Sequence, residues 1–193
     1  MDKSKAYEKN AETFLKLRGH VNNTIGVEEV RKWTQSLPDK SRVLDLGCGN
    51  GFPLTKILVD HDLDVYAIDA SESLCRDFKK NFPETSIACE TAENSELFKL
   101  KFDAILSWGL IFLLTEKEQE ALIKKVSEAL FINGRYLFTA PWQKTRWKDT
   151  LTGEDSVSLG RNRYKELLNS AGLIVLDEFQ DSGENHYFSC IKK

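Results

Sequence analysis

Three closely spaced glycines are the residues of this chain best suited to bind a ligand. Gly47, Gly49 and Gly51 follow an apolar run at residues 43–46 and precede an amphipathic segment. Glycine lets the backbone turn sharply and lets a ligand lie against it, and the free N–H groups at the start of a following helix face that ligand. The stretch RVLDLGCGNGFPLTKIL therefore predicts a strand, a glycine turn and a helix that together bind a nucleotide.

The glycine spacing distinguishes between kinds of nucleotide. Counted from Gly47, the dinucleotide-binding pattern GxGxxG would place its third glycine at position 52, where this chain has Phe52. The third glycine comes one residue earlier instead. The stretch DLGCGNG resembles motif I of the class I S-adenosylmethionine-dependent methyltransferases, (D/E)xGxGxG. Asp45, Gly47, Gly49 and Gly51 fill its four fixed positions.

An aspartate follows at the end of the next predicted strand, over residues 65–68. Asp69 lies about 20 residues beyond the glycines, and its carboxylate has enough lone pairs to accept hydrogen bonds from both hydroxyls of a ribose. Capping of the next helix is the alternative role, but Ser71 is better placed to cap a helix over residues 71–81. We therefore expect Asp69 to bind the ribose, as the resemblance also implies.

Composition limits the class of protein. A chain of 193 residues fits one domain, and its net charge of −3 does not suggest a nucleic-acid partner. The KKVSE run is assigned to the solvent-exposed face of a helix. The cysteines have no metal-site spacing, and neither a signal peptide nor a membrane span is apparent. We expect one cytoplasmic domain over residues 1–193, a monomer or homodimer without a metal or membrane.

Strand and helix patterns alternate along the chain. Two helices are predicted within residues 1–38, before the first strand, and Thr115 and Glu118 predict a capping box for a later helix that Asn133 and Gly134 end. Strands are predicted at residues 43–46, 65–68, 85–89, 102–107, 135–140, 173–179 and 186–191. This order predicts a doubly wound, Rossmann-like α/β fold. Its seven-stranded sheet is mostly parallel with an antiparallel last strand, and helices cover both faces, as in class I methyltransferases.

The resemblance implies contacts with S-adenosylmethionine at the carboxyl ends of the strands. Ala92 would lie beside the adenine, while Thr91 or Glu93 would accept a hydrogen bond from its amino group. Trp108 would lie beside the methionine part, or it is an ordinary core residue. The implied cofactor-binding set is Tyr7, Arg18, Asp45, Gly47, Cys48, Gly49, Gly51, Asp69, Ala70, Thr91, Ala92, Glu93, Ser107 and Trp108.

The N-terminal stretch YEKNAETFLKLR supplies two members of that set, since it resembles the YxxxAxxYxxxR opening of many small-molecule methyltransferases. Tyr7 would pack over the cofactor pocket, and the Arg18 guanidinium would approach the methionine carboxylate. An exposed arginine that ends a helix is the alternative for Arg18.

The segment over residues 141–159 is the predicted substrate loop. It follows the fifth strand and has weak periodicity, and a long loop in a compact domain usually has a function. A lid or wall over the methyl donor is favoured over a flexible connection. Trp142, Arg146 and Trp147 could contact and orient a small acceptor.

His186 is the candidate general base. The start of the last, antiparallel strand lies at the ligand-binding edge, with Asp181, Glu184 and Asn185 nearby to orient the ring. An imidazole there could take a proton from an attacking hydroxyl or amine. A structural histidine is the alternative, because alignment of the nucleophile alone supplies much of the acceleration in methyl transfer.

These patterns together predict an enzyme that moves a methyl group from S-adenosylmethionine to an O, N or S atom of a small molecule by in-line displacement, with S-adenosylhomocysteine as product. The glycines indicate binding and not chemistry, so a catalytically silent sensor or partner subunit that binds the cofactor is the alternative. A nicotinamide-dependent oxidoreductase is disfavoured by Phe52 and by the single short domain.

Overall fold

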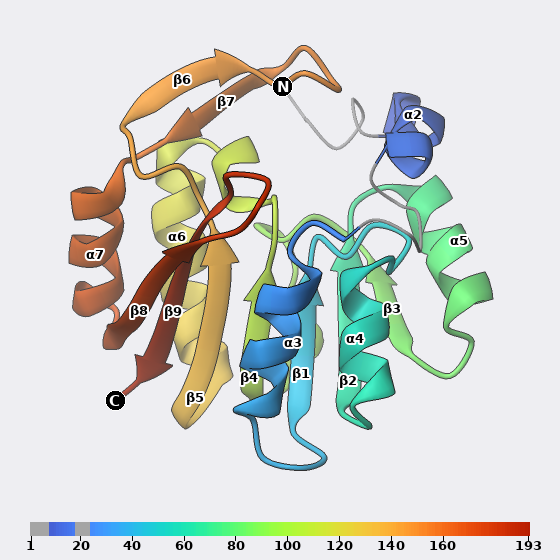
Figure 1. Cartoon of the computed structure of the whole chain (residues 1–193), viewed down its shortest axis with the longest axis horizontal. Helices are drawn as coiled ribbons and strands as arrows, with labels where there is room; N and C mark the ends of the chain where they lie inside the picture. Colours follow the sequence, from blue (N-terminus) through green and yellow to red (C-terminus); the bar gives the residue numbers. More distant parts are fainter. Residues whose placement is uncertain (1–7, 18–23) are drawn as a thin grey trace.

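A twisted seven-stranded sheet forms the centre of the computed structural model, which describes residues 8–17 and 24–193 (Figure 1). Its strands are β1 (Arg42–Leu46), β2 (Asp64–Asp69), β3 (Ser86–Cys89), β4 (Phe102–Ser107), β5 (Leu130–Thr139), β8 (Leu173–Gln180) and β9 (His186–Lys192). They lie in the order β3-β2-β1-β4-β5-β9-β8. The pairs from β3 to β5 are parallel, and β9 is antiparallel to both of its neighbours. The predicted sheet is confirmed.

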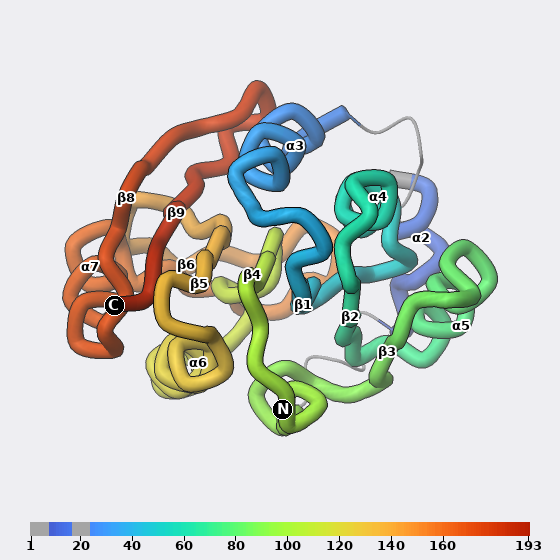
Figure 2. The backbone as a smooth tube through the Cα atoms, turned by 90° about the horizontal axis from the view of Figure 1, so that it is seen from below, coloured from blue at the N-terminus to red at the C-terminus, as the bar shows by residue number. Residues whose placement is uncertain are grey.

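Helices cover both faces of the sheet, as in a doubly wound fold (Figure 2). One face carries α3 (Val27–Gln35), α4 (Leu54–Asp60) and α5 (Glu72–Asn81), and the other carries α6 (Glu116–Ala129) and α7 (Arg161–Ser170). Val43 packs in the cluster that includes α3 and α4, while its neighbour Leu44 packs in the cluster that includes α6, because successive strand residues point to opposite faces. None of the described helices has the length and apolar character of a membrane span.

The N-terminal helix α2 (Ala11–Leu17) lies beside α5 at the carboxyl edge of the sheet (Figure 1). The carboxylate of Glu8 accepts hydrogen bonds from the Ser71 hydroxyl and from the Ser73 backbone N–H, at 3.1 Å for the latter, at the start of α5. A carboxylate at the positive end of a helix is stabilised by the free N–H groups there. This contact holds α2 over the edge of the sheet where β1 and β2 end.

Helix α6 begins where the sequence predicts but ends earlier. Thr115 caps it and forms the predicted capping box with Glu118. The helix ends at Ala129, and β5 begins at the extended residue Leu130, so the predicted helix end at Asn133 and strand start at 135 were wrong. The residues between form an irregular stretch of β5, because the register shifts from Phe102 opposite Leu130 to Ala104 opposite Arg135.

The segment over residues 141–159 is a β-hairpin and not an irregular loop. Its strands β6 (Thr145–Lys148) and β7 (Asp155–Ser158) pair antiparallel and lie above the carboxyl edge of the sheet (Figure 1). Both strands are four residues long, which is too short for a clear alternation of apolar and polar residues. The expectation of an irregular segment is corrected in this respect.

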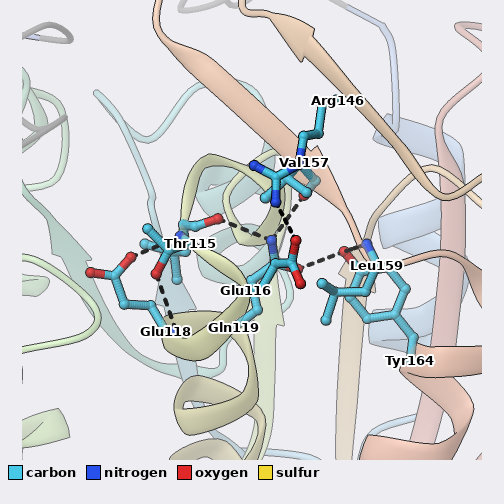
Figure 3. Close-up of polar contacts among 9 residues, drawn as sticks. Thr115, Glu116, Glu118, Gln119, Arg146, Val157, Leu159 and Tyr164 are labelled. Carbon is cyan, nitrogen blue, oxygen red and sulfur yellow. Dashed lines mark hydrogen bonds and ion pairs between the residues drawn. The ribbon is translucent and has the colours of Figure 1, made fainter.

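Buried side chains hold the base of this hairpin (Figure 3). The Gln119 side-chain amide donates to the carbonyls of Leu114, at 3.0 Å, and Val157, at 2.8 Å. Its oxygen accepts from the Tyr164 hydroxyl at 2.7 Å. An ion pair between Arg146 and Glu116 also links β6 to α6. The hairpin is therefore fixed to α6 and α7 rather than loosely attached.

Candidate functional site

The turn after β1 has a shape that requires glycine. Gly47, Gly49 and Gly51 have positive φ values of 77°, 59° and 87°, a region that other residues rarely adopt. Space is also limited, since a Cβ on Gly51 would lie 2.3 Å from a ring carbon of Phe82, and a Cβ on Gly49 would lie 2.9 Å from Phe14 of α2. Residues with a Cβ would therefore strain or clash in this turn, whose backbone lies at the carboxyl edge of the sheet.

Asp69 lies beside this turn, because β1 and β2 pair in parallel with Leu46 opposite Ile68. Its carboxylate accepts hydrogen bonds from the backbone N–H of Gly49, at 2.8 Å, and of Ser71, at 2.9 Å. Burial raises the pKa of Asp69, and these backbone donors counteract part of that rise. Each carboxylate oxygen can accept a further hydrogen bond, so Asp69 can still bind the hydroxyls of a ligand.

Ser71, and not Asp69, caps α5 through its side chain. The Ser71 hydroxyl oxygen accepts a hydrogen bond of 3.2 Å from the Leu74 backbone N–H. The prediction that Ser71 caps this helix is therefore confirmed.

Asp45 is the buried acid of the glycine motif. It is 3% exposed, and its Oδ2 accepts a hydrogen bond of 2.6 Å from the Thr55 hydroxyl. The pKa of Asp45 is raised to about 7, mainly by burial; the Thr55 hydrogen bond opposes this rise, and the nearby Asp69 adds to it. A cation that bound beside Asp45 would favour its ionised form.

A cavity of about 750 Å³ opens over the carboxyl ends of the strands. This volume lies in the range of small-molecule and cofactor sites. Of the residues implied to bind the cofactor, those that line it are Asp45, Gly47, Cys48, Asp69, Ala70, Thr91, Ala92, Glu93 and Trp108. Gly49 and Gly51 shape the turn, Ser107 is fully buried, and Tyr7 and Arg18 lie outside the described residues.

The loop after β3 forms one wall of the cavity. The Thr91 hydroxyl is buried and lacks a hydrogen-bond partner in the described part of the chain, although Thr91 lines the cavity. The ammonium of Lys125 on α6 donates to the carbonyls of Ala92, Glu93 and Ser95 at 3.2, 2.6 and 2.9 Å. Lys125 thus fixes this loop, contrary to the assignment of the KKVSE run to a purely solvent-exposed face.

A buried chain of hydrogen bonds fixes Trp108 at the cavity. The Trp108 indole N–H donates to the Tyr187 hydroxyl at 2.7 Å, and that hydroxyl donates to Asp181 Oδ2 at 2.8 Å. Asp181 is 7% exposed and also accepts from the Asn185 side-chain amide. Burial first, and the Asp181 carboxylate second, raise the pKa of Tyr187, so the phenol stays protonated and continues to donate. Trp108 and Asn185 line the cavity, whereas Tyr187 and Asp181 support them from behind.

His186 is not among the residues that line the cavity. Its ring stacks on the Trp142 indole, with centroids 4.4 Å apart and planes inclined by 22°. Asp181 and Asn185, which the sequence places near His186, form their hydrogen bonds with each other and with Tyr187. The role of His186 as a base stays a prediction that this placement does not favour.

The hairpin contributes to the cavity through different residues from those expected. Asp149, Thr150 and Leu151, in its turn, line the cavity, whereas Trp142, Arg146 and Trp147 do not. Trp147 packs against Phe112, which does line the cavity, with ring centroids 5.4 Å apart. No group of three or more candidate metal ligands occurs in residues 8–17 and 24–193.

Comparisons with known proteins agree with this architecture. Residues 43–134 match the family model of a methyltransferase domain, and no curated protein matches the sequence. The methyltransferase CcbJ from Streptomyces caelestis superposes with a TM-score of 0.78 at 14% identity, over 100% of both chains. The 1,6-didemethyltoxoflavin-N1-methyltransferase from Burkholderia thailandensis, solved with S-adenosylhomocysteine, gives 0.79 at 13% identity, over 98% of this chain and 87% of that one. A TehB-like methyltransferase from Corynebacterium glutamicum gives 0.71 at 21% identity, over 98% of this chain and 97% of that one.

Proposed function

We propose that this protein binds S-adenosylmethionine and transfers its methyl group to a small molecule, because residues 43–134 match the family model of a methyltransferase domain and the whole chain has the class I methyltransferase fold. One observation carries the proposal. The Asp69 carboxylate and the glycine turn are joined by a hydrogen bond at the wall of a cavity large enough for a cofactor and an acceptor.

The residues at this wall fit the parts of the cofactor. Asp69 is placed to accept hydrogen bonds from ribose hydroxyls, and the buried Thr91 hydroxyl, which lacks a partner among the described residues, can accept one from the adenine amino group. Asp45 lines the cavity with a buried carboxylate, which would face a positively charged group of the cofactor. Tyr7 and Arg18 keep the roles that the resemblance implies.

Positioning is the main contribution that we assign to the protein. The cofactor supplies a methyl group bound to a positively charged sulfur. When an acceptor atom attacks the methyl carbon in line, the sulfur leaves as the neutral thioether of S-adenosylhomocysteine. The fixed indole of Trp108 and the hairpin turn at residues 149–151 would exclude water and align that acceptor. This assignment needs no general base at His186.

We propose that the methyl group goes to an O, N or S atom of the small molecule. One protein of similar fold is named as an N1-methyltransferase, which supports a nitrogen acceptor. The alternative is a protein that binds the cofactor without transferring methyl groups.

A labelled cofactor distinguishes these possibilities. The protein would be incubated with S-adenosylmethionine carrying a deuterated methyl group and a small-molecule cell extract, and products would be identified by mass spectrometry. We expect one extract component to gain the label, and the Asp69→Ala variant to lose this transfer. Cofactor binding without any labelled product would support the silent alternative, and the absence of cofactor binding would reject the proposal.

A further inference from the structure

The cavity has further lining residues besides those assigned to the cofactor, and we call one group of them the acceptor side. This acceptor side combines residues from the β4–α6 connection, the first turn of α6 and the turn of the hairpin. It consists of Leu110, Phe112, Leu113, Glu118, Asp149 and Leu151. Four of these side chains are apolar and two are carboxylates. The acceptor side therefore offers an apolar surface with negative charge next to it.

All ionisable charged side chains that line the cavity, among the described residues, are carboxylates. On the cofactor side, the Asp45 carboxylate would face a positively charged group of S-adenosylmethionine, and the Asp69 carboxylate would face its ribose. Glu118 and Asp149 lie on the acceptor side, and no lysine, arginine or histidine of the described residues lines the cavity with them. Two basic residues of the hairpin pair with other carboxylates: Arg146 with Glu116, and Lys148 with Asp155.

Both carboxylates on the acceptor side are held in place by the local backbone. Glu118 accepts a hydrogen bond of 2.7 Å from the Thr115 N–H in the capping box. Asp149 Oδ1 accepts from the backbone N–H groups of Leu151 and Thr152, at 3.1 and 2.8 Å. Because these donors orient the two carboxylates, the negative charge is a fixed property of the site and not that of a freely moving side chain.

We propose that the methyl acceptor is an amine carried on an apolar body. This inference rests on the proposed function. Leu110, Phe112 and Leu151 would contact the apolar body, while Glu118 and Asp149 would attract and hydrogen-bond the nitrogen. An acceptor that carries a carboxylate or phosphate would be disfavoured, because like charges repel at short range in a partly desolvated site.

The transfer step is balanced in this arrangement. An ammonium acceptor first gives a proton to a carboxylate or to water, which frees the nitrogen lone pair. The neutral nitrogen then forms a bond to the methyl carbon while the carbon–sulfur bond breaks and sulfur keeps that electron pair. The products are an N-methyl ammonium and S-adenosylhomocysteine.

Binding of three matched probes tests the inference. The full-length protein would first be shown to bind S-adenosylhomocysteine, and then be saturated with it. Calorimetry would measure the binding of 2-phenylethylamine, 2-phenylethanol and 3-phenylpropionate, which share one apolar body, together with the corresponding cyclohexyl series. We expect an amine to bind at least about tenfold more tightly than its matched carboxylate.

Two variants connect this preference to the structure. Glu118→Gln keeps a side-chain oxygen for the capping box, and Asp149→Asn keeps the Oδ1 acceptor of the hairpin turn. Each should weaken amine binding about fivefold or more, with unchanged binding of S-adenosylhomocysteine. Glu120→Gln is the matched control, since Glu120 is on the same helix but pairs with Arg163.

Three outcomes would overturn the inference: carboxylate binding as tight as amine binding, amine binding unchanged in both variants, or no amine binding at millimolar concentration. If the parent protein does not bind S-adenosylhomocysteine, the proposed function itself is rejected. The two failures are therefore distinguishable.

Discussion

The backbone N–H of Gly49 donates a hydrogen bond of 2.8 Å to Asp69 Oδ2. Two residues 20 positions apart in sequence are thereby joined at the carboxyl ends of adjacent parallel strands. The carboxylate that would bind the ribose also fixes the glycine turn beside it. A change at Asp69 should consequently affect both the hydrogen bonds to a ligand and the shape of the turn.

Asp45 predicts a particular dependence of stability on pH. Burial raises its pKa in the folded protein to about 7, from a reference value of 3.8. The folded state thus holds this proton more tightly than the unfolded state, and the stability that it contributes is fully present below about pH 4 and is lost as the pH rises through about 7. Urea unfolding should show that stability falls less between about pH 5 and about pH 8 in the Asp45→Asn variant than in the parent. Equal losses would mean that Asp45 does not titrate in this range.

Lys125 is expected to support the cofactor wall. Lys125→Met removes three hydrogen bonds to the carbonyls of the loop after β3, and should lower the free energy of unfolding by about 1–3 kcal/mol. Affinity for S-adenosylhomocysteine, measured by calorimetry, should fall because the loop that contains Thr91 is loosened. Lys124→Met is the control, since Lys124 is exposed and its one ion pair among the described residues, with Glu128, is long at 3.8 Å. Equal effects of both substitutions would argue against this role.

Gly26 is expected to be sensitive to a single added methyl group. A Cβ there would lie 2.8 Å from the Tyr187 hydroxyl and 2.9 Å from Trp108 Nε1, at the hydrogen bond that fixes Trp108. Its φ is +78°, so Gly26→Ala combines backbone strain with a clash, and should cost about 2–4 kcal/mol in urea unfolding. Gly153→Ala is the matched control, because Gly153 has φ +72° and no atom within 4 Å of the added Cβ. A cost at Gly26 no larger than at Gly153 would show that the packing tolerates the change.

His186 is expected to support structure and not proton transfer. His186→Phe should preserve the stacking on Trp142 and keep the rate of methyl transfer within about threefold, measured on the small molecule that takes up the labelled methyl group. A general base would contribute about 100-fold or more. A loss of that size, in a variant that remains folded and binds the cofactor, would restore His186 as the base.

The sheet, and the position of Asp69 beside the glycine turn, were the parts best predicted from sequence. The apolar strands, the glycines and Asp69 carry local signals, and the parallel order of β1 and β2 brings those signals together. The capping box at Thr115 and Glu118 is likewise encoded within four residues.

Contacts between distant residues escaped prediction for physical reasons. Lys125 lies in a charged run that is typical of a solvated helix face, and periodicity does not reveal that its long side chain reaches the loop after β3. Residues 186 and 187 point to opposite faces of β9, so Tyr187, and not His186, joins Trp108 and Asp181. Likewise, nothing local to residues 141–159 predicts that Gln119 binds the hairpin.

Calorimetric titration with S-adenosylhomocysteine tests the central claim most directly. We expect the parent protein to bind one molecule per chain with a dissociation constant in the micromolar range, about −8 kcal/mol, and Asp69→Ala to bind at least about tenfold more weakly while it remains folded by circular dichroism. No binding by the folded parent at high micromolar concentration would contradict the account, as would an Asp69→Ala variant that binds as tightly as the parent.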